Sequence, residues 1–202
     1  MRLLVDSDAF CKLAVSGLLS DAAALFNAEL GECGRLPALT HMLRRGQLRQ
    51  TYGATACDGL IPLAESMPSV VSPPTSWLEQ LTLICDVDPG EAILFATAAD
   101  RRIPVLTGDI RSLRALKNVD RFPEALEGRV AVLEAVLVGL CGRLGTAAVR
   151  ARVESVPQAD TVIRICFSPG VEEPELALRS YLGDRRRELA PLVLWGADEE
   201  EV

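Results

Sequence analysis

Residues Ile84 to Leu113, ICDVDPGEAILFATAADRRIPVLTGDIRSL, decide the fold because they join a helix start, a buried helix and a strand in direct succession. Asp88-Pro-Gly favours a helix start, since proline suits the first turn and an acid suits the positive end of the helix dipole. The apolar residues 92–99 predict a helix packed on a sheet. The run from Ile103 to Thr107 predicts a short, buried parallel strand.

Acidic residues stand at the ends of these elements. Glu91 lies in the first turn of the predicted helix, and Asp109 follows the predicted strand. At the amino terminus, a predicted strand over residues 2–5 runs into Asp6 and Asp8. In open α/β sheets the working residues gather at the carboxyl ends of the strands, so we expect these four acids to converge.

Four converging carboxylates predict a bound cation. Like charges repel one another unless a cation lies among them, and Mg²⁺ and Mn²⁺ prefer oxygen ligands. A structural interpretation competes with this one, because Asp at a strand end and Glu at a helix start are good helix caps in any protein. For a single acid the two interpretations are equally good, but the set as a whole favours an acidic metal site on a parallel sheet.

The order of these motifs resembles the PIN-domain nucleases. The resemblance rests on LLVDSDAFCKL (residues 3–13) and DPGEAILFATAADRRIPVLTGDIRSL (residues 88–113), and it extends over residues 1–135. It implies a three-layer α/β sandwich with a central, mostly parallel sheet flanked by helices. It also implies a metal-dependent ribonuclease that hydrolyses RNA, with toxin-like action and an antitoxin as a protein partner in part of the family.

Site residues are carried over from this resemblance by position. It implies that Asp6, Glu91 and Asp109 are catalytic and bind Mg²⁺ or Mn²⁺, with Asp8 as a further ligand or a hydrogen-bond acceptor behind them. The family usually has another Glu near residue 40, where this chain has His41 or Met42. The resemblance therefore implies a metal site that is incomplete or is completed by another residue.

Basic residues after Asp109 are candidate contacts for a substrate phosphate. Arg111, Arg114 and Lys117 lie on or directly after a predicted helix over residues 110–116. Their position beside a proposed catalytic acid favours a grip on phosphate. A helix face with solvated basic side chains fits the same pattern equally well.

The composition limits the class of protein. The chain has 202 residues, of which 49% are hydrophobic and 4% aromatic, and its net charge is −7. The hydrophobic content supports a folded core, whereas the low aromatic content and the negative charge argue against a broad surface that coats nucleic acid. Six scattered cysteines and one histidine do not form a zinc pattern. We recognise no signal peptide or membrane span, so we expect a cytoplasmic protein with reduced thiols.

The organisation changes near residue 140. We expect a PIN-like domain over residues 1–140 and a helical extension over residues 141–202 that packs on it. In the first part, helices are predicted over residues 9–19, 21–30, 37–53, 53–66 and 77–84, with a last strand that begins at residue 129. In the extension, helices are predicted over residues 146–155, 160–167 and 172–189. A strand remains the alternative for residues 160–167, which are rich in β-branched side chains. The extension could cover a sheet face, form a homodimer or receive a partner.

Two further functions remain open. A PIN-like scaffold without full activity would bind a protein partner through the extension, and the missing acid is its best support. A haloacid dehalogenase-like phosphohydrolase would use Asp6 as nucleophile, with Gly108-Asp109 as its late motif. Against this alternative, the chain has no lysine between Lys12 and Lys117, where these enzymes need one.

Overall fold

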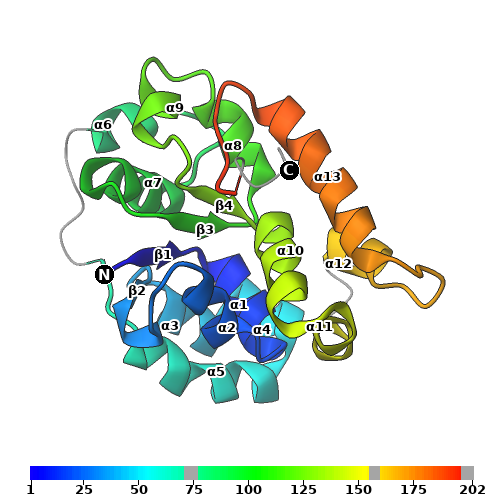
Figure 1. Ribbon diagram of the computed structural model, residues 1–202. Helices are drawn as coiled ribbons and strands as arrows, with labels where there is room; N and C mark the ends of the chain where they lie inside the picture. The colour runs from blue at the N-terminus through cyan, green and yellow to red at the C-terminus, as the bar shows by residue number, and fades with distance from the viewer. Residues whose placement is uncertain (71–76, 155–159, 197–202) are drawn as a thin grey trace.

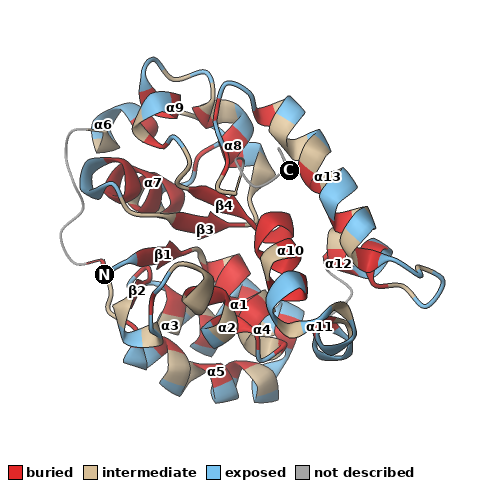
Figure 2. Ribbon diagram, viewed as in Figure 1, coloured by how far each residue is buried: buried red, intermediate tan, exposed pale blue. Residues whose placement is uncertain are grey.

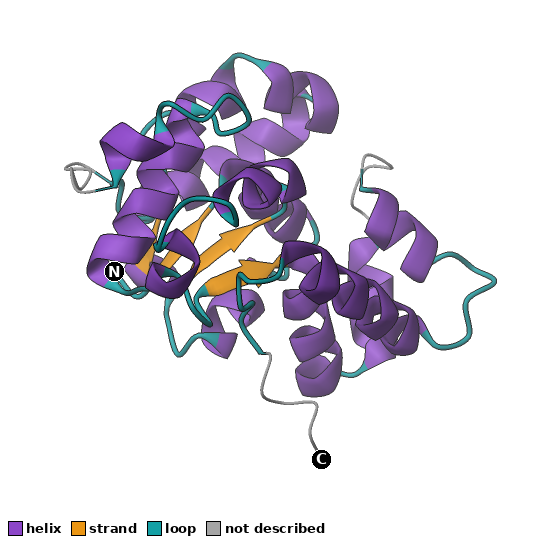
Figure 3. Ribbon diagram, turned by 90° about the horizontal axis from the view of Figure 1, so that it is seen from above, coloured by secondary structure: helices purple, strands orange, loops and turns teal. Residues whose placement is uncertain are grey.

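The computed structural model describes residues 1–70, 77–154 and 160–196. In these residues the strands form one parallel sheet in the order β2-β1-β3-β4. The strands are β1 (Leu3–Val5), β2 (Cys33–Gly34), β3 (Val105–Thr107) and β4 (Val130–Val132). Helices cover both faces of the sheet (Figures 1 and 3). The predicted α/β class, with a parallel sheet between helices, is therefore confirmed.

Apart from the buried Thr107, the strands contain no polar side chain, because both faces of the sheet are buried (Figure 2). Successive strand residues point to opposite faces, so Leu3 and Val5 enter one core while Leu4 and Val105 enter the other. The first core is closed by α1 (Ser7–Val15), α2 (Leu19–Leu25), α3 (Leu39–Arg44), α4 (Gln47–Tyr52), α5 (Ala54–Ser66) and α10 (Leu133–Leu144). The second core is closed by α6 (Leu78–Leu81), α7 (Pro89–Arg101), α8 (Ile110–Leu116) and α9 (Phe122–Ala125).

Three predicted helices are shorter than expected. The single helix predicted over residues 37–53 is wrong, since α3 and α4 are separated at Gly46, whose φ of 135° a helix cannot accommodate. The helix predicted over residues 21–30 ends at Leu25, just before Asn27 adopts a positive φ of 52°. The helix predicted over residues 77–84 is the single turn α6.

The carboxyl-terminal part adds α11 (Thr146–Val153), α12 (Thr161–Cys166) and α13 (Pro174–Leu189). The strand alternative for residues 160–167 is therefore wrong. The end of the helix predicted over residues 146–155, and the chain beyond residue 196, lie outside the described residues. The expected boundary at residue 140 falls inside α10.

The helices after α10 add apolar residues to the same two cores as the sheet. Val149 and Ile163 pack into the first core, whereas Leu182 and Leu189 pack into the second. The Trp195 N–H then donates to the Val130 carbonyl at 2.8 Å, so the chain returns to the edge of the sheet. Within the ranges given above, every helix is too short or too polar to cross a lipid bilayer.

Candidate active site

Asp6 ends β1 and begins α1. Its backbone N–H donates to the Leu106 carbonyl at 2.9 Å, and its carboxylate accepts a 2.7 Å hydrogen bond from the Ser7 N–H. Burial raises the pKa of Asp6 to about 7, although the Ser7 hydrogen bond opposes this rise. The nearby charges of three further acids, Asp8, Asp88 and Asp109, raise the Asp6 pKa further. Asp6 is therefore both a helix cap and a buried acid whose charged form is disfavoured by its surroundings.

Glu91 is held by a reciprocal cap at the start of α7. The Glu91 N–H donates to Asp88 Oδ1 at 2.8 Å, and the Asp88 N–H donates to Glu91 Oε2 at 2.9 Å. Ser112 of α8 donates its hydroxyl to the same Glu91 oxygen at 2.5 Å. Glu91 is 6% exposed, and this burial raises its pKa to about 8.

Asp109 follows β3 and caps α8, where it accepts a 3.1 Å hydrogen bond from the Ser112 N–H. Its carboxyl group also shares a hydrogen bond with Glu91. Burial alone would raise the pKa of Asp109, but the hydrogen bonds from Glu91 and Ser112 and the charge of Arg111 lower it. The two carboxyl groups thus affect each other in opposite directions, since their interaction raises the pKa of Glu91 and lowers that of Asp109.

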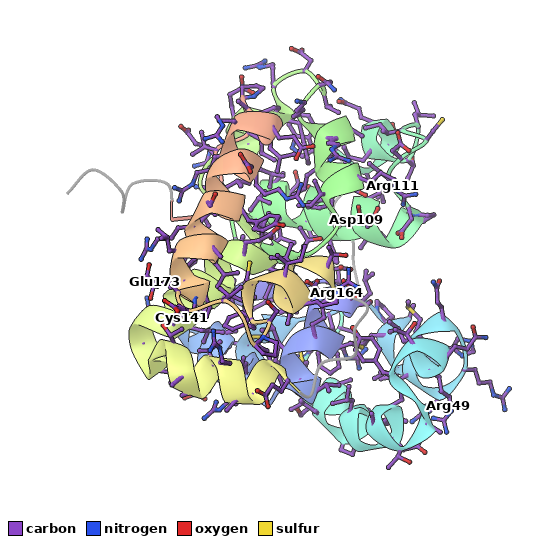
Figure 4. The ribbon with its side chains drawn as sticks, turned by 90° about the vertical axis from the view of Figure 1, so that its right-hand side faces the viewer. Arg49, Asp109, Arg111, Cys141, Arg164 and Glu173 are labelled. Carbon is purple, nitrogen blue, oxygen red and sulfur yellow. The ribbon has the colours of Figure 1, made fainter. Side chains whose placement is uncertain are left out.

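A cleft of about 750 Å³ opens at the carboxyl ends of β1 and β3. All four predicted acids, Asp6, Asp8, Glu91 and Asp109, line it, so the structure brings them to one place. The rest of the lining consists of Ser7, Leu36, Ala38, Met42, Gln47, Leu48, Thr51, Tyr52, Asp88, Gly90, Gly108 and Arg111. Figure 4 shows Asp109 and Arg111 together at the start of α8.

Asp8 has partners that the sequence did not predict. Lys12, one turn later on α1, places its Nζ 2.6 Å from Asp8 Oδ2 and 2.7 Å from Asp160 Oδ2. Tyr52 donates its hydroxyl to Asp8 Oδ1 at 3.5 Å. The spacing of Asp8 and Lys12 was a readable signal, since residues four apart are neighbours on a helix. Asp160 lies 148 positions after Lys12 in the sequence, and no local sequence pattern links the two residues.

The position of the missing acid is apolar. Leu36, Ala38 and Met42 line the cleft there, while His41 is exposed and does not line it. Asp88, which the sequence identified only as a helix start, adds a further carboxylate to the lining.

The three predicted phosphate contacts separate into two groups. Arg111 lines the cleft, with its Nη2 3.8 Å from Asp109 Oδ2. Arg114 and Lys117 face α13 instead, where Arg114 pairs with the Glu188 carboxylate and Lys117 donates to the Glu188 carbonyl at 2.6 Å.

The chemistry of the donor set suits Mg²⁺ or Mn²⁺, because Asp6, Glu91 and Asp109 offer carboxylate oxygens in one cleft. Their side chains are nonetheless turned toward helix caps and toward one another. Across the described ranges, no three His, Cys, Asp or Glu side chains form a group already arranged to hold a metal. A cation bound there would favour the charged form of Glu91 and so oppose the rise of its pKa.

Comparison of the chain with family models, curated proteins and solved structures finds no match.

Proposed function

We propose that this protein is a metal-dependent ribonuclease that hydrolyses phosphodiester bonds in RNA. The proposal rests on one observation: Asp6, Glu91 and Asp109, which stand at the starts of α1, α7 and α8, line a single cleft. The pKa values of Asp6 and Glu91, raised to about 7 and about 8 chiefly by burial, support it, because a cation in the cleft would remove this cost.

Asp6, Glu91 and Asp109 would hold Mg²⁺ or Mn²⁺, with Asp88 at the edge of the same cleft. The bound cation would polarise the scissile phosphate and supply a water molecule activated for attack. Arg111 stands next to Asp109 on the cleft wall and can pair with a phosphate oxygen. Gln47 and Thr51 of α4 offer uncharged polar groups to a nucleotide on the opposite wall.

The choice of RNA comes from the order of the sequence motifs, which resembles the PIN-domain nucleases. The overall charge of −7 fits a local grip on phosphate near Arg111 better than a broad basic surface. The same resemblance leads us to propose a toxin-like role in the cytoplasm, with an antitoxin as the protein partner.

A scaffold function is the second candidate. Leu36, Ala38 and Met42 occupy the wall where the family usually has an acid, and this favours weak or absent catalysis. The phosphohydrolase alternative has less support. Lys12 is bound by Asp8 and Asp160, and Lys117 is bound by Glu188, so neither pairs with Asp6.

The proposal is tested by cleavage of a mixed RNA pool with and without Mn²⁺. We expect cleavage by the parent protein only with Mn²⁺, and a loss of about a hundredfold or more in Asp6→Asn, which keeps an oxygen to cap α1. Glu188→Gln is the matched control, because it also removes one carboxylate but lies outside the cleft, and it should cleave like the parent. A folded parent that cleaves no RNA, or an Asp6→Asn variant that cleaves like the parent, would support the scaffold instead.

A further inference from the structure

Lys12 is enclosed by two carboxylates beside the cleft. Its Nζ lies 2.6 Å from Asp8 Oδ2 and 2.7 Å from Asp160 Oδ2, and the Lys12 side chain is only 11% exposed. Asp160 is equally enclosed, with 10% of its side chain exposed and its other oxygen bonded to the Ile163 N–H at 2.8 Å. The ammonium is therefore fixed from both sides.

The enclosed ammonium lies next to the turn that ends β3. A Cβ placed on Gly108 would stand 3.6 Å from Lys12 Nζ and 3.2 Å from Asp8 Oδ2. The residue after Gly108 is Asp109, one of the acids of the cleft. A positive charge is thus held close to one side of an otherwise acidic site.

This arrangement divides the acids of the cleft into two sets. Asp8 has both oxygens engaged, one by Lys12 and the other by the Tyr52 hydroxyl. Asp6, Glu91 and Asp109 have no cation at comparable distance in the described residues except Arg111, which stays 3.8 Å from Asp109. A second divalent cation on the Asp8 side of the cleft, about 4 Å from the first as in two-metal sites, would compete with Lys12 for the Asp8 oxygen.

We propose that Lys12 is a built-in cation that replaces a second metal ion, so that the cleft binds one divalent cation at Asp6, Glu91 and Asp109. This inference rests on the proposed function, since it assigns the number of metal ions in the same site. It also gives the carboxyl-terminal helices a part in the site: Asp160, which caps α12, positions the Lys12 ammonium. Lys12 and Asp160 are positioning residues in this account.

The experiment counts bound Mn²⁺ by calorimetric titration of three proteins. The parent should bind one Mn²⁺ per chain. Lys12→Met should bind two, because Asp8 and Asp160, which approach one ammonium from two sides, become free to share a cation. Lys117→Met is the matched control, since the chain has only these two lysines and Lys117 faces α13; it should bind one.

The outcomes separate the two proposals. A parent that binds no Mn²⁺ overturns the proposed function and this inference with it. A parent that binds one Mn²⁺, with Lys12→Met also binding one, overturns only the inference, as does a parent that binds two.

Where the loss of Lys12 unfolds the protein, the cause is the Asp160 carboxylate, whose side chain is 10% exposed and which then lacks its cation. For that case we predict that millimolar Mn²⁺ restores the circular dichroism spectrum of Lys12→Met, since the metal takes the place of the ammonium, while Na⁺ at equal ionic strength does not. A variant that stays unfolded in Mn²⁺ overturns the inference.

Discussion

Two acids of the cleft, Asp6 and Glu91, have surroundings opposite to those of Glu188 at the contact between α8 and α13. In the cleft, burial raises the pKa values of Asp6 and Glu91. At the other contact, Glu188 pairs with Arg114 and Arg185, and the hydrogen bond from Arg114 lowers the pKa of Glu188. Glu188, paired with two arginines, joins α8 to α13, whereas Asp6 and Glu91 form no ion pair among the described residues and mark the place where we propose a metal binds.

The largest effect that sharpens this comparison is on the free energy of unfolding, at a second contact of Arg185, with Glu134 of α10. Arg185 Nε lies 3.2 Å from Glu134 Oε1, and the Glu134 side chain is only 5% exposed. Arg185→Met should lower the free energy of unfolding by about 3 kcal/mol, because it leaves a buried carboxylate without its partner. Urea denaturation measures this change, and RNA cleavage by the remaining folded protein should be unaffected.

Two controls accompany that variant. Arg187→Ala, on the same helix, breaks an exposed pair with Asp184 and should cost less than about 1 kcal/mol. Adding Glu134→Leu to Arg185→Met should recover most of the lost stability, since it removes the unpaired charge. Equal losses in Arg185→Met and Arg187→Ala would show that the buried contact does not depend on matched charge.

The next effect concerns pH and the buried acids Asp6 and Glu91. The Asp6 pKa is raised from 3.8 to about 7 in the folded protein, so the folded state keeps a proton that the unfolded chain releases in this range. Stability of the metal-free protein should therefore fall as the pH rises from about 5.5 to about 8, by roughly 2 kcal/mol from Asp6 alone. Glu91, with its pKa raised to about 8, acts in the same direction.

Denaturation of the metal-free parent and of Asp6→Asn at both pH values measures the Asp6 contribution. The variant should lose less stability than the parent over this range and should be the more stable protein at about pH 8. The lowered pKa values of Asp109 and Glu188 do not interfere, because these groups lose stabilisation only at more acidic pH. If the metal-free parent gains stability as the pH rises, the pKa of Asp6 is not raised in the folded protein.

The smallest expected effect is on RNA binding, and it distinguishes Arg111, which lines the cleft, from Arg114, which does not. Arg111→Ala should weaken RNA binding by about fivefold, with a slope of log affinity against log salt reduced by about 1, because one phosphate contact is lost. Arg114→Ala should leave binding unchanged, since Arg114 is held by Glu188. Fluorescence anisotropy of a labelled RNA across salt concentrations compares them. Equal behaviour of the two variants would remove Arg111 from the binding surface.

The local sequence pattern predicted the strands and the acids that cap helices, because both depend on residues close together in the chain. Apolar runs located β1, β3 and β4, and the position of an acid after a strand located Asp6 and Asp109. Both interpretations of the acids apply at once, because Asp6 and Asp109 cap helices and also line the cleft. The capping spacing of Asp88 and Glu91 was equally visible in the sequence.

Contacts between distant segments could not be predicted in this way. Arg114 and Lys117 contact Glu188 because α13 packs beside α8. No sequence pattern near residue 114 indicates where α13 packs. The link from Lys12 to Asp160 depends on the return of α12 to α1. The break between α3 and α4 required recognition that Gly46 adopts a positive φ, although a glycine inside a helix is also tolerated.

Thermal melting with and without Mn²⁺ tests the central claim most directly, that Asp6, Glu91 and Asp109 hold a divalent cation. At a hundredfold excess of Mn²⁺ over Kd, the parent should gain about 2.7 kcal/mol of stability, because the metal binds only the folded state. Asp6→Asn, which keeps its cap to the Ser7 N–H but loses a ligand charge, should gain far less. Equal gains in both proteins, or no gain in the parent, would contradict the claim.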